Sequence, residues 1–300
     1  MPGISIVILS LMRLPHTRRC IEALYRHTAL PIELVIVDMG SNDAVLSYLD
    51  MLCSREPNVT VLKNDRNIGT AAGRNQGAAQ VNGDWLVFLD NDAEVTHGWL
   101  EALLAFDSGV NVGVCVPKLL SSLREVLVAP NSVVDGISRN GNPVIGFRLE
   151  RSYSAGDAAI NQDCVVPWYP TTCLMVRSEI FRRVGGFDEN IFLAEEDKDL
   201  CLSIRQLGYQ IAYAPKAEVH HATLDNSPEY RAIRDNLLVL NKDKCYFEKK
   251  WKRKVIMECS RKFLRARGMS DEAITLKKRF DVFTTVIEHG DSFSTAQEVH

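Results

Sequence analysis

DWLVFLDND, residues 84–92, is the stretch that decides the predicted fold of this chain. Its apolar run begins at Trp85 and is short and rich in aromatic and β-branched side chains, which is typical of a strand buried on both faces. The run ends abruptly at Asp90, Asn91 and Asp92. Carboxylates at the end of a buried strand are costly to keep unless something uses them, and a hard divalent cation would use them. A plain strand-terminating turn is the alternative, because Asp and Asn favour turns.

Strand and helix candidates alternate through the first part of the chain. Short apolar runs predict further strands, and helical spacing predicts the segments between them. The expected strands are 4–9, 33–37, 59–62 and 112–116, and the expected helices are 17–27, a segment ending near Cys53, and 99–106. This alternation predicts an α/β protein with a mostly parallel sheet and helices on both faces. Asp38 and Asp90 both follow strands, so we expect them at the ligand-binding edge of that sheet.

The composition is ordinary for a soluble globular protein. The 300 residues are 46% apolar and 24% charged, and the net charge of −3 gives no reason to expect nucleic-acid binding. The eight cysteines are scattered without a C-x-x-C pair, which indicates free thiols in a reducing compartment. The first residues carry no basic leader, and no apolar stretch approaches the ~20 residues of a membrane span. We therefore expect a cytoplasmic protein.

Seven short motifs stand in one order along the chain. They are VDMGSND (37–43), NIGTAAGRNQG (67–77), LDND (89–92), CLMVR (173–177), GGFDE (185–189), EDKDL (196–200) and PKAEVHH (215–221). In this order they resemble the family 2 glycosyltransferases, which have the GT-A fold. The resemblance implies a GT-A domain over 1–225, with a donor half over about 1–118 and an acceptor half over about 119–225. Residues 226–300 would then form a mainly helical C-terminal extension.

The resemblance also implies an activity. The chain would move a hexose or deoxyhexose from a UDP-, dTDP- or GDP-sugar to a hydroxyl acceptor, with inversion in a single displacement. A divalent metal, Mn²⁺ or Mg²⁺, would assist, and the acceptor would be a glycan or a lipid-linked compound in polysaccharide or glycoconjugate assembly. A nucleotidyltransferase is the enzymatic alternative, although residues 9–18 lack the glycine-rich phosphate loop it would need. A catalytically idle nucleotide-sugar-binding protein is the other alternative.

By resemblance, three residues are metal ligands. Asp92 would bind the metal directly, Asp90 would contact the ribose or share the metal through water, and His221 would be the third ligand. His220 is the adjacent rival. Without the family pattern, a packed or surface imidazole is the better interpretation of either histidine.

The resemblance assigns nine residues to the nucleotide sugar: Ser10, Asp38, Asn67, Gly69, Arg74, Asp90, Asn91, Thr172 and Cys173. Asp38 would accept a hydrogen bond from the base, although a turn-starting aspartate explains it equally well. Arg74 would pair with phosphate or with the Asp90 and Asp92 carboxylates; an ordinary solvated helix arginine is the alternative. The first strand continues as Leu9-Ser10-Leu11-Met12 instead of the family's P-T-Y-N, so the base stays open.

Residues 195–199, EEDKD, are predicted to open a helix. Acidic side chains in a first turn are stabilised by the helix dipole by about 0.3–1 kcal/mol each, which alone could explain the cluster. The family, however, places its catalytic base here. We expect Asp197 to be the base that deprotonates the acceptor hydroxyl, with Glu196 as the second choice.

Two further stretches carry weaker predictions. Residues 121–163 read as an irregular insertion of short strands near the acceptor. Residues 242–267 hold eleven Lys or Arg against three Asp or Glu, a local charge of +8. This basic stretch could hold an anionic acceptor or contact a membrane surface peripherally, while a solvated helix face is the plainer interpretation. Trp168 and Tyr169 could stack on a sugar or pack in the core.

Overall fold

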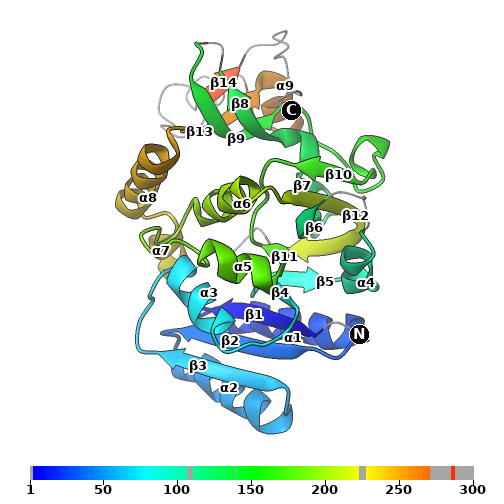
Figure 1. Cartoon of the computed structure of the whole chain (residues 1–300), viewed down its shortest axis with the longest axis vertical. Helices are drawn as coiled ribbons and strands as arrows, with labels where there is room; N and C mark the ends of the chain where they lie inside the picture. The colour runs from blue at the N-terminus through cyan, green and yellow to red at the C-terminus, as the bar shows by residue number, and fades with distance from the viewer. Residues whose placement is uncertain (1–2, 107–110, 139, 223–227, 271–284, 288–300) are drawn as a thin grey trace.

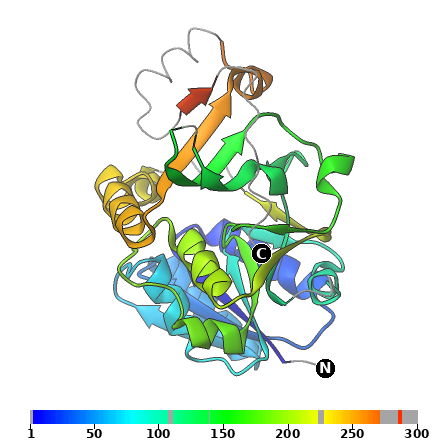
Figure 2. The ribbon, with the colours of Figure 1, turned by 45° about the horizontal axis from the view of Figure 1, so that its top comes forward.

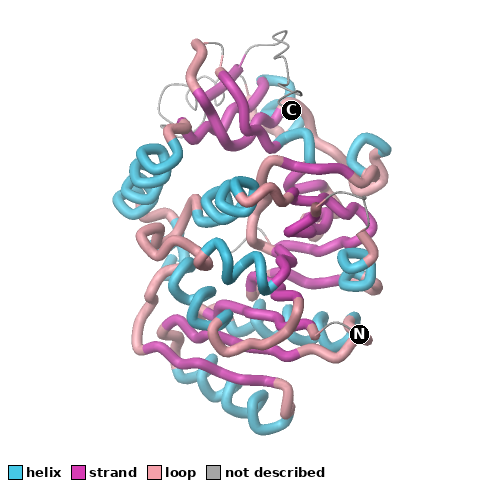
Figure 3. The backbone as a smooth tube through the Cα atoms, viewed as in Figure 1, coloured by secondary structure: helices cyan, strands magenta, loops and turns pink. Residues whose placement is uncertain are grey.

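The structure is a computed structural model that describes residues 3–106, 111–138, 140–222, 228–270 and 285–287. A ten-stranded sheet forms the body of the molecule, and a separate four-stranded sheet lies at the end opposite β3 and α2 (Figure 1). Figure 3 shows the same arrangement by element type, with helices beside both parts of the large sheet.

The first half of the large sheet is parallel and has the order β4-β1-β2-β3. Its strands are β1 (Ile4–Ser10), β2 (Glu33–Met39), β3 (Val59–Asn64) and β4 (Trp85–Asp90), joined by α1 (Leu14–His27), α2 (Asp43–Arg55) and α3 (Thr70–Ala78). The chain steps outward from β1 to β3 and then returns to β4. Because parallel crossovers are right-handed, α1 and α2 belong on one face and α3 on the other. The predicted strands and helices of this half are confirmed, and α3 is an addition.

Two glycines let α3 pack closely on the sheet. Gly73 and Gly77 are one turn apart and therefore face the same way. A Cβ on Gly77 would lie 2.5 Å from Val7 Cγ1, and one on Gly73 would lie 2.8 Å from Met39 Sδ. The small residues of NIGTAAGRNQG thus bring the helix backbone down onto β1 and β2, and they fix the position of Arg74, which follows Gly73.

The second half of the large sheet is mixed. β11 (Cys173–Arg177) lies antiparallel between β4 and β6 (Val112–Leu120), and β12 (Gln210–His221) pairs parallel with β6. The remaining strands are β5 (Ala93–Val95), β7 (Val126–Val128) and β10 (Cys164–Val166), and the helices are α4 (Trp99–Leu104), α5 (Ser178–Val184) and α6 (Glu196–Gln206). The mostly parallel sheet expected from the sequence is therefore limited to the first half, because the returning strand β11 is inserted antiparallel beside β4.

The four-stranded sheet has the order β14-β13-β9-β8 and joins the insertion to the C-terminal part. Its strands are β8 (Val133–Ile137), β9 (Pro143–Leu149), β13 (Lys254–Ser260) and β14 (Thr285–Ile287), and the helices nearby in sequence are α7 (Pro228–Arg234), α8 (Leu237–Trp251) and α9 (Arg261–Ala266), with 3₁₀ turns at Pro130–Ser132 and Ala158–Ile160. Figure 2 shows β13 and β9 side by side, with α8 between this sheet and the body. The expected helical C-terminal extension therefore also contains strands, because β13 finds a partner in β9.

One extended core joins the sheet to its helices. Trp168 and Tyr169 are fully buried in it, and each satisfies its polar atom on a backbone carbonyl, that of Val134 and Val128 respectively. These two aromatic side chains therefore serve packing and do not line a sugar site. Among the described residues, no helix is both long and apolar enough to cross a membrane.

Candidate active site

The carboxyl ends of β1, β2 and β4 meet at one edge of the sheet. The register pairs Ser10 with Asp38 and Leu9 with Asp90, so the two aspartates lie on one rim as predicted. Beside this rim is a cavity of about 440 Å³. Its lining includes Asp90 and Asp92 from the end of β4 and Glu196 and Asp197 from the start of α6. Acidic side chains from distant segments thus share one cavity.

Asp90, Asp92 and His221 form a cluster in which one ligand atom from each lies within 4.8 Å of the others. The pairing of β5 with β12 produces it, because the register sets His221 opposite Ala93, the residue after Asp92. His221 Nε2 lies 3.1 Å from Asp92 Oδ1. His220 turns away, with Nδ1 3.2 Å from the carbonyl oxygen of Ser121. Two carboxylates and one imidazole suit Mn²⁺ or Mg²⁺, so the predicted ligands fit a divalent cation.

Asp92 is held from two sides. Arg13 Nη1 donates to its Oδ2 at 2.8 Å, and both side chains are buried. Burial alone would raise the pKa of Asp92, but His221 and Arg13 together hold it well below its usual range. In return, Asp92 raises the pKa of His221 against the lowering effect of burial. Asp92 is therefore ionised across the neutral range and oriented toward the cluster.

Arg74 bridges the two ends of the cavity. Its guanidinium donates to Glu196 Oε1 at 2.7 Å and to Asp90 Oδ1 at 3.0 Å. The side chain is almost fully buried, so this pairing takes place away from bulk water. Of the alternatives open from the sequence, the pairing with Asp90 is the one that the structure contains. Arg74 links the proposed metal ligand to the acidic start of α6.

The two acids at the start of α6 have different surroundings. Burial is the largest influence on Glu196 and raises its pKa to about 7, opposed by Arg74 and reinforced by Asp197. Asp197 is more accessible, and its Oδ1 accepts the backbone N–H of Lys198 at 2.7 Å. Lys198 also pairs with Glu195 at 2.8 Å and lies over the Trp168 ring. Both acids line the cavity; Asp197 is the more accessible of the two, while Glu196 is bonded to Arg74.

The residues assigned to the nucleotide sugar are brought only partly together. Asn67, Arg74, Asp90, Asn91 and Thr172 line the cavity. Gly69, Cys173, Ser10 and Asp38 are not among the residues that line it. Gly69 packs its backbone against Phe192, and Cys173 is buried in β11 opposite Leu89.

Ser10 and Asp38 are a special case among these. Both are fully buried, and Ser10 Oγ and Asp38 Oδ1 have no hydrogen-bond partner among the described residues. The other oxygen of Asp38 accepts the N–H groups of Gly40 and Ser41 at 3.1 and 3.0 Å. Buried polar atoms are normally satisfied, so a water molecule or a ligand group is expected to supply the missing partners of these two.

Three residues of the site were missed by sequence reasoning. Arg13 reaches Asp92 from a loop in which Met12 and Arg13 both have φ of 54°, which no short motif signals. Tyr230 covers the Arg13 guanidinium at 4.3 Å, and Tyr230 and Arg234 from α7 line the cavity. The one available signal was the departure from P-T-Y-N, which marks this loop as different.

Comparison with known proteins identifies the family of this chain. The sequence profile of Glycosyl transferase family 2 matches residues 5–185, more than half of the chain. The chain belongs to glycosyl transferase family 2. Among its relatives in that family, the pre-mycofactocin glycosyltransferase of Mycobacterium tuberculosis is 32% identical over 193 residues, covering 63% of this chain and 37% of that protein. The N-acetylglucosaminyl-diphospho-decaprenol L-rhamnosyltransferase of the same organism is 28% identical over 225 residues, covering 69% and 72%. The chain therefore spans well under half of the first of these relatives.

Solved structures show that the family 2 chain has the GT-A fold. The mannosyltransferase PcManGT from Pyrobaculum calidifontis, in complex with GDP-Man and Mn²⁺, superposes with a TM-score of 0.56 at 17% identity, covering 83% of this chain and 64% of that one. GalNAc-T7 with UDP, GalNAc and Mn²⁺ gives a TM-score of 0.59 at 15% identity, covering 95% and 55%. At these identities the likeness establishes the shared architecture.

Proposed function

We propose that this chain transfers a hexose or deoxyhexose from a nucleoside-diphosphate sugar to a hydroxyl acceptor by a single inverting displacement. One observation carries the proposal: Asp92 and Asp197 line the same cavity. A single displacement needs the leaving diphosphate and the attacking hydroxyl on opposite sides of the anomeric carbon. A cavity with a cation-binding group at the end of β4 and a base at the start of α6 provides for both.

On the donor side, Asp90, Asp92 and His221 would hold Mn²⁺ or Mg²⁺. Such an ion, when bound, offsets the charge on the diphosphate and orients it. Asp38 would accept a hydrogen bond from the base, and Ser10 would contact the nucleotide beside it. The bound GDP-Man and UDP of the structural neighbours support a nucleotide donor.

On the acceptor side, Asp197 would take the proton as the hydroxyl attacks. Glu196 would not take this proton, because its carboxylate is bonded to Arg74. Phe147, Leu240 and Met257 also line the cavity, which supports an acceptor with an apolar part, such as a lipid-linked glycan. The peripheral membrane contact expected for residues 242–267 has less support, because Lys250, Arg253 and Lys254 pair with acids of this chain.

The test is a donor screen. The protein is incubated with UDP-, GDP- and dTDP-sugars, with Mn²⁺ or with EDTA, in the presence of simple alkyl glycoside acceptors. We expect a metal-dependent thermal shift and nucleoside diphosphate release with one donor class, and loss of both in EDTA. Pyrophosphate release from nucleoside triphosphates would instead identify a nucleotidyltransferase. Binding without turnover of any donor would identify an idle nucleotide-sugar-binding protein.

A further inference from the structure

A buried carboxylate on α8 holds the segment that leads into the catalytic acids. Asp243 is fully buried. Its Oδ1 accepts the backbone N–H of Phe192 at 3.1 Å, and its Oδ2 accepts those of Leu193 at 2.7 Å and Ala194 at 3.1 Å. Three successive N–H groups of one loop therefore converge on one side chain from another element. Burying a carboxylate is tolerable when several hydrogen bonds compensate it, as they do here.

The same loop is held from the donor half on its other side. The carbonyl oxygen of Phe192 accepts the backbone N–H of Thr70 at 2.7 Å and its hydroxyl at 3.2 Å. Thr70 opens α3, the helix that carries Arg74. Gly69 leaves room for this contact, because a Cβ there would lie 2.8 Å from the Phe192 ring. Loop 192–194 is thus stretched between α3 and α8.

The loop ends in a conformation that needs support. Glu195, its next residue, has a φ of 78°, and the chain turns there into α6. Non-glycine residues in the left-handed region are strained and persist where the surroundings fix them. Asp197 is in the first turn of that helix. The position of its carboxylate in the cavity therefore depends on where the loop places the start of α6.

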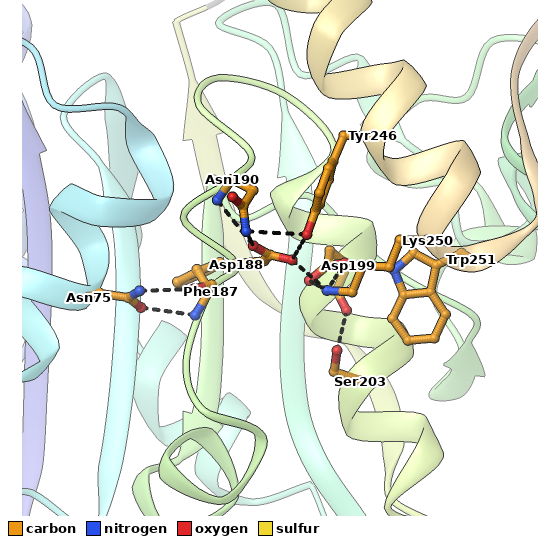
Figure 4. A network of polar contacts seen from close by, with 9 residues as sticks. All are labelled: Asn75, Phe187, Asp188, Asn190, Asp199, Ser203, Tyr246, Lys250 and Trp251. Atoms are coloured by element: carbon orange, nitrogen blue, oxygen red, sulfur yellow. Dashed lines mark hydrogen bonds and ion pairs between the residues drawn. The ribbon is translucent and has the colours of Figure 1, made fainter.

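α8 is itself fixed to the body by a second set of contacts (Figure 4). Lys250 Nζ reaches between Asp188, at 2.8 Å, and Asp199 of α6, at 2.7 Å. Tyr246 also donates to Asp188, at 2.8 Å, and Trp251 Nε1 donates to Asp199 at 2.6 Å. The helix that presents Asp243 is therefore bonded to the same helix that presents Asp197.

We propose that Asp243 is a positioning residue for sugar transfer, which sets the location of Asp197 by fixing loop 192–194 from α8. This role rests on the proposed function. Asp243 does not line the cavity and takes no part in the chemistry. Its three hydrogen bonds fix the loop that leads to Asp197, while the proposed metal ligands Asp90, Asp92 and His221 come from the end of β4 and from β12. Loss of Asp243 should therefore affect turnover and spare donor binding.

The experiment compares Asp243→Asn with Asp235→Asn. The amide keeps the shape of the side chain but turns an N–H group toward a backbone donor. Asp235 is a matched control, because it is exposed and, in the described part of the chain, its side chain pairs with the nearby Arg231. We expect Asp243→Asn to lower kcat about 10- to 100-fold while the donor KM and the Mn²⁺-dependent binding of the nucleoside diphosphate stay within about twofold. Hydrogen exchange should quicken at the amides of residues 192–194.

Lys250→Met is the second variant, because Lys250 is partly exposed and its loss loosens α8, which carries Asp243, without altering the Asp243 side chain. It replaces Asp243→Asn as the test if that variant does not fold. We expect it likewise to lower kcat while the donor KM changes little. Unchanged kcat in either folded variant, or equal losses in kcat and donor binding, would overturn the role. Absence of turnover in the wild-type protein with every donor would instead refute the proposed function.

Discussion

Asp197 and Glu196 are adjacent, yet their side chains have different surroundings. The Asp197 side chain is 16% exposed and reaches the cavity, whereas Glu196 is 9% exposed and bonded to Arg74. We expect Asp197→Asn to lower turnover by about 10²- to 10⁴-fold, the usual contribution of a general base. Binding of the nucleoside diphosphate with Mn²⁺ should be unchanged, because Asp197 is not among the proposed ligands. Product release assays and isothermal titration calorimetry measure the two effects.

The control for this substitution is Asp163→Asn, which neutralises an exposed acid outside the cavity lining. It should leave both turnover and binding unchanged. Full activity in Asp197→Asn would assign the base to Glu196, whose pKa of about 7 is suitable for proton transfer near neutral pH.

At the scale of single residues, the acids and their partners Arg74 and His221 were predictable, but Arg13 and Asp243 were not. Asp90, Asp92 and Asp197 stand in short motifs whose order can be read directly. Arg13 could not be found this way, because its contact with Asp92 depends on two successive left-handed residues in an irregular loop. Asp243 has no motif either, since its role depends on the backbone of a loop that is remote in sequence.

Among the elements, the turn before α6 and the end of α8 are joined by a contact whose strength depends on pH. Burial alone would raise the pKa of Asp188, but hydrogen bonds from Lys250, Asn190 and Tyr246 lower it to about 2. An unfolded aspartate titrates near 3.9. This contact therefore adds stability above about pH 4, and the stability is lost as the pH falls through about 2.

Asp188→Asn should reveal this dependence. We expect the variant to have a free energy of unfolding lower by about 1 kcal/mol at pH 7, after allowance for solvent screening. The difference from wild type should shrink as the pH is lowered from 4 toward 2. Urea unfolding at a series of pH values measures it, with Asp65→Asn, an exposed acid, as the control. A difference that does not depend on pH would show that the ion pair is not its source.

Elements with a clear period were predicted, and those set by distant partners were not. The parallel strands β1 to β4 are short and mostly apolar, with many β-branched residues, so the sequence predicts them directly. α3 is hidden by its glycines, which lower helix propensity but are required where the helix touches β1 and β2. β13 lies in a basic stretch that suggests a solvated helix, and its pairing with β9 and β14 makes it a strand.

On the scale of the whole molecule, the C-terminal part is built into the site. β13 pairs with β9 from the insertion, and Met257 and Phe147 from these two strands both line the cavity. Leu240 of α8 lines it as well, while Asp243 and Lys250 hold the acidic loop and α6. The end of the cavity proposed for the acceptor is therefore completed by segments from within the family-matched region, which ends at residue 185, and from the chain that follows it.

The close packing of β9 against β13 can be tested at Gly146. It has a φ of 147°, and a Cβ there would overlap the carbonyl oxygen of Ile256 on β13. We expect Gly146→Ala to destabilise the protein by about 1–3 kcal/mol, because the added methyl forces β9 and β13 apart. Since these strands carry Phe147 and Met257, turnover should fall more than donor binding does. Urea unfolding and hydrogen exchange at residues 254–260 measure the separation. Gly136→Ala on the neighbouring strand β8 is the control, because its Cβ would meet nothing within 4 Å. Equal effects of the two substitutions would mean that close contact between β9 and β13 does not close the acceptor end.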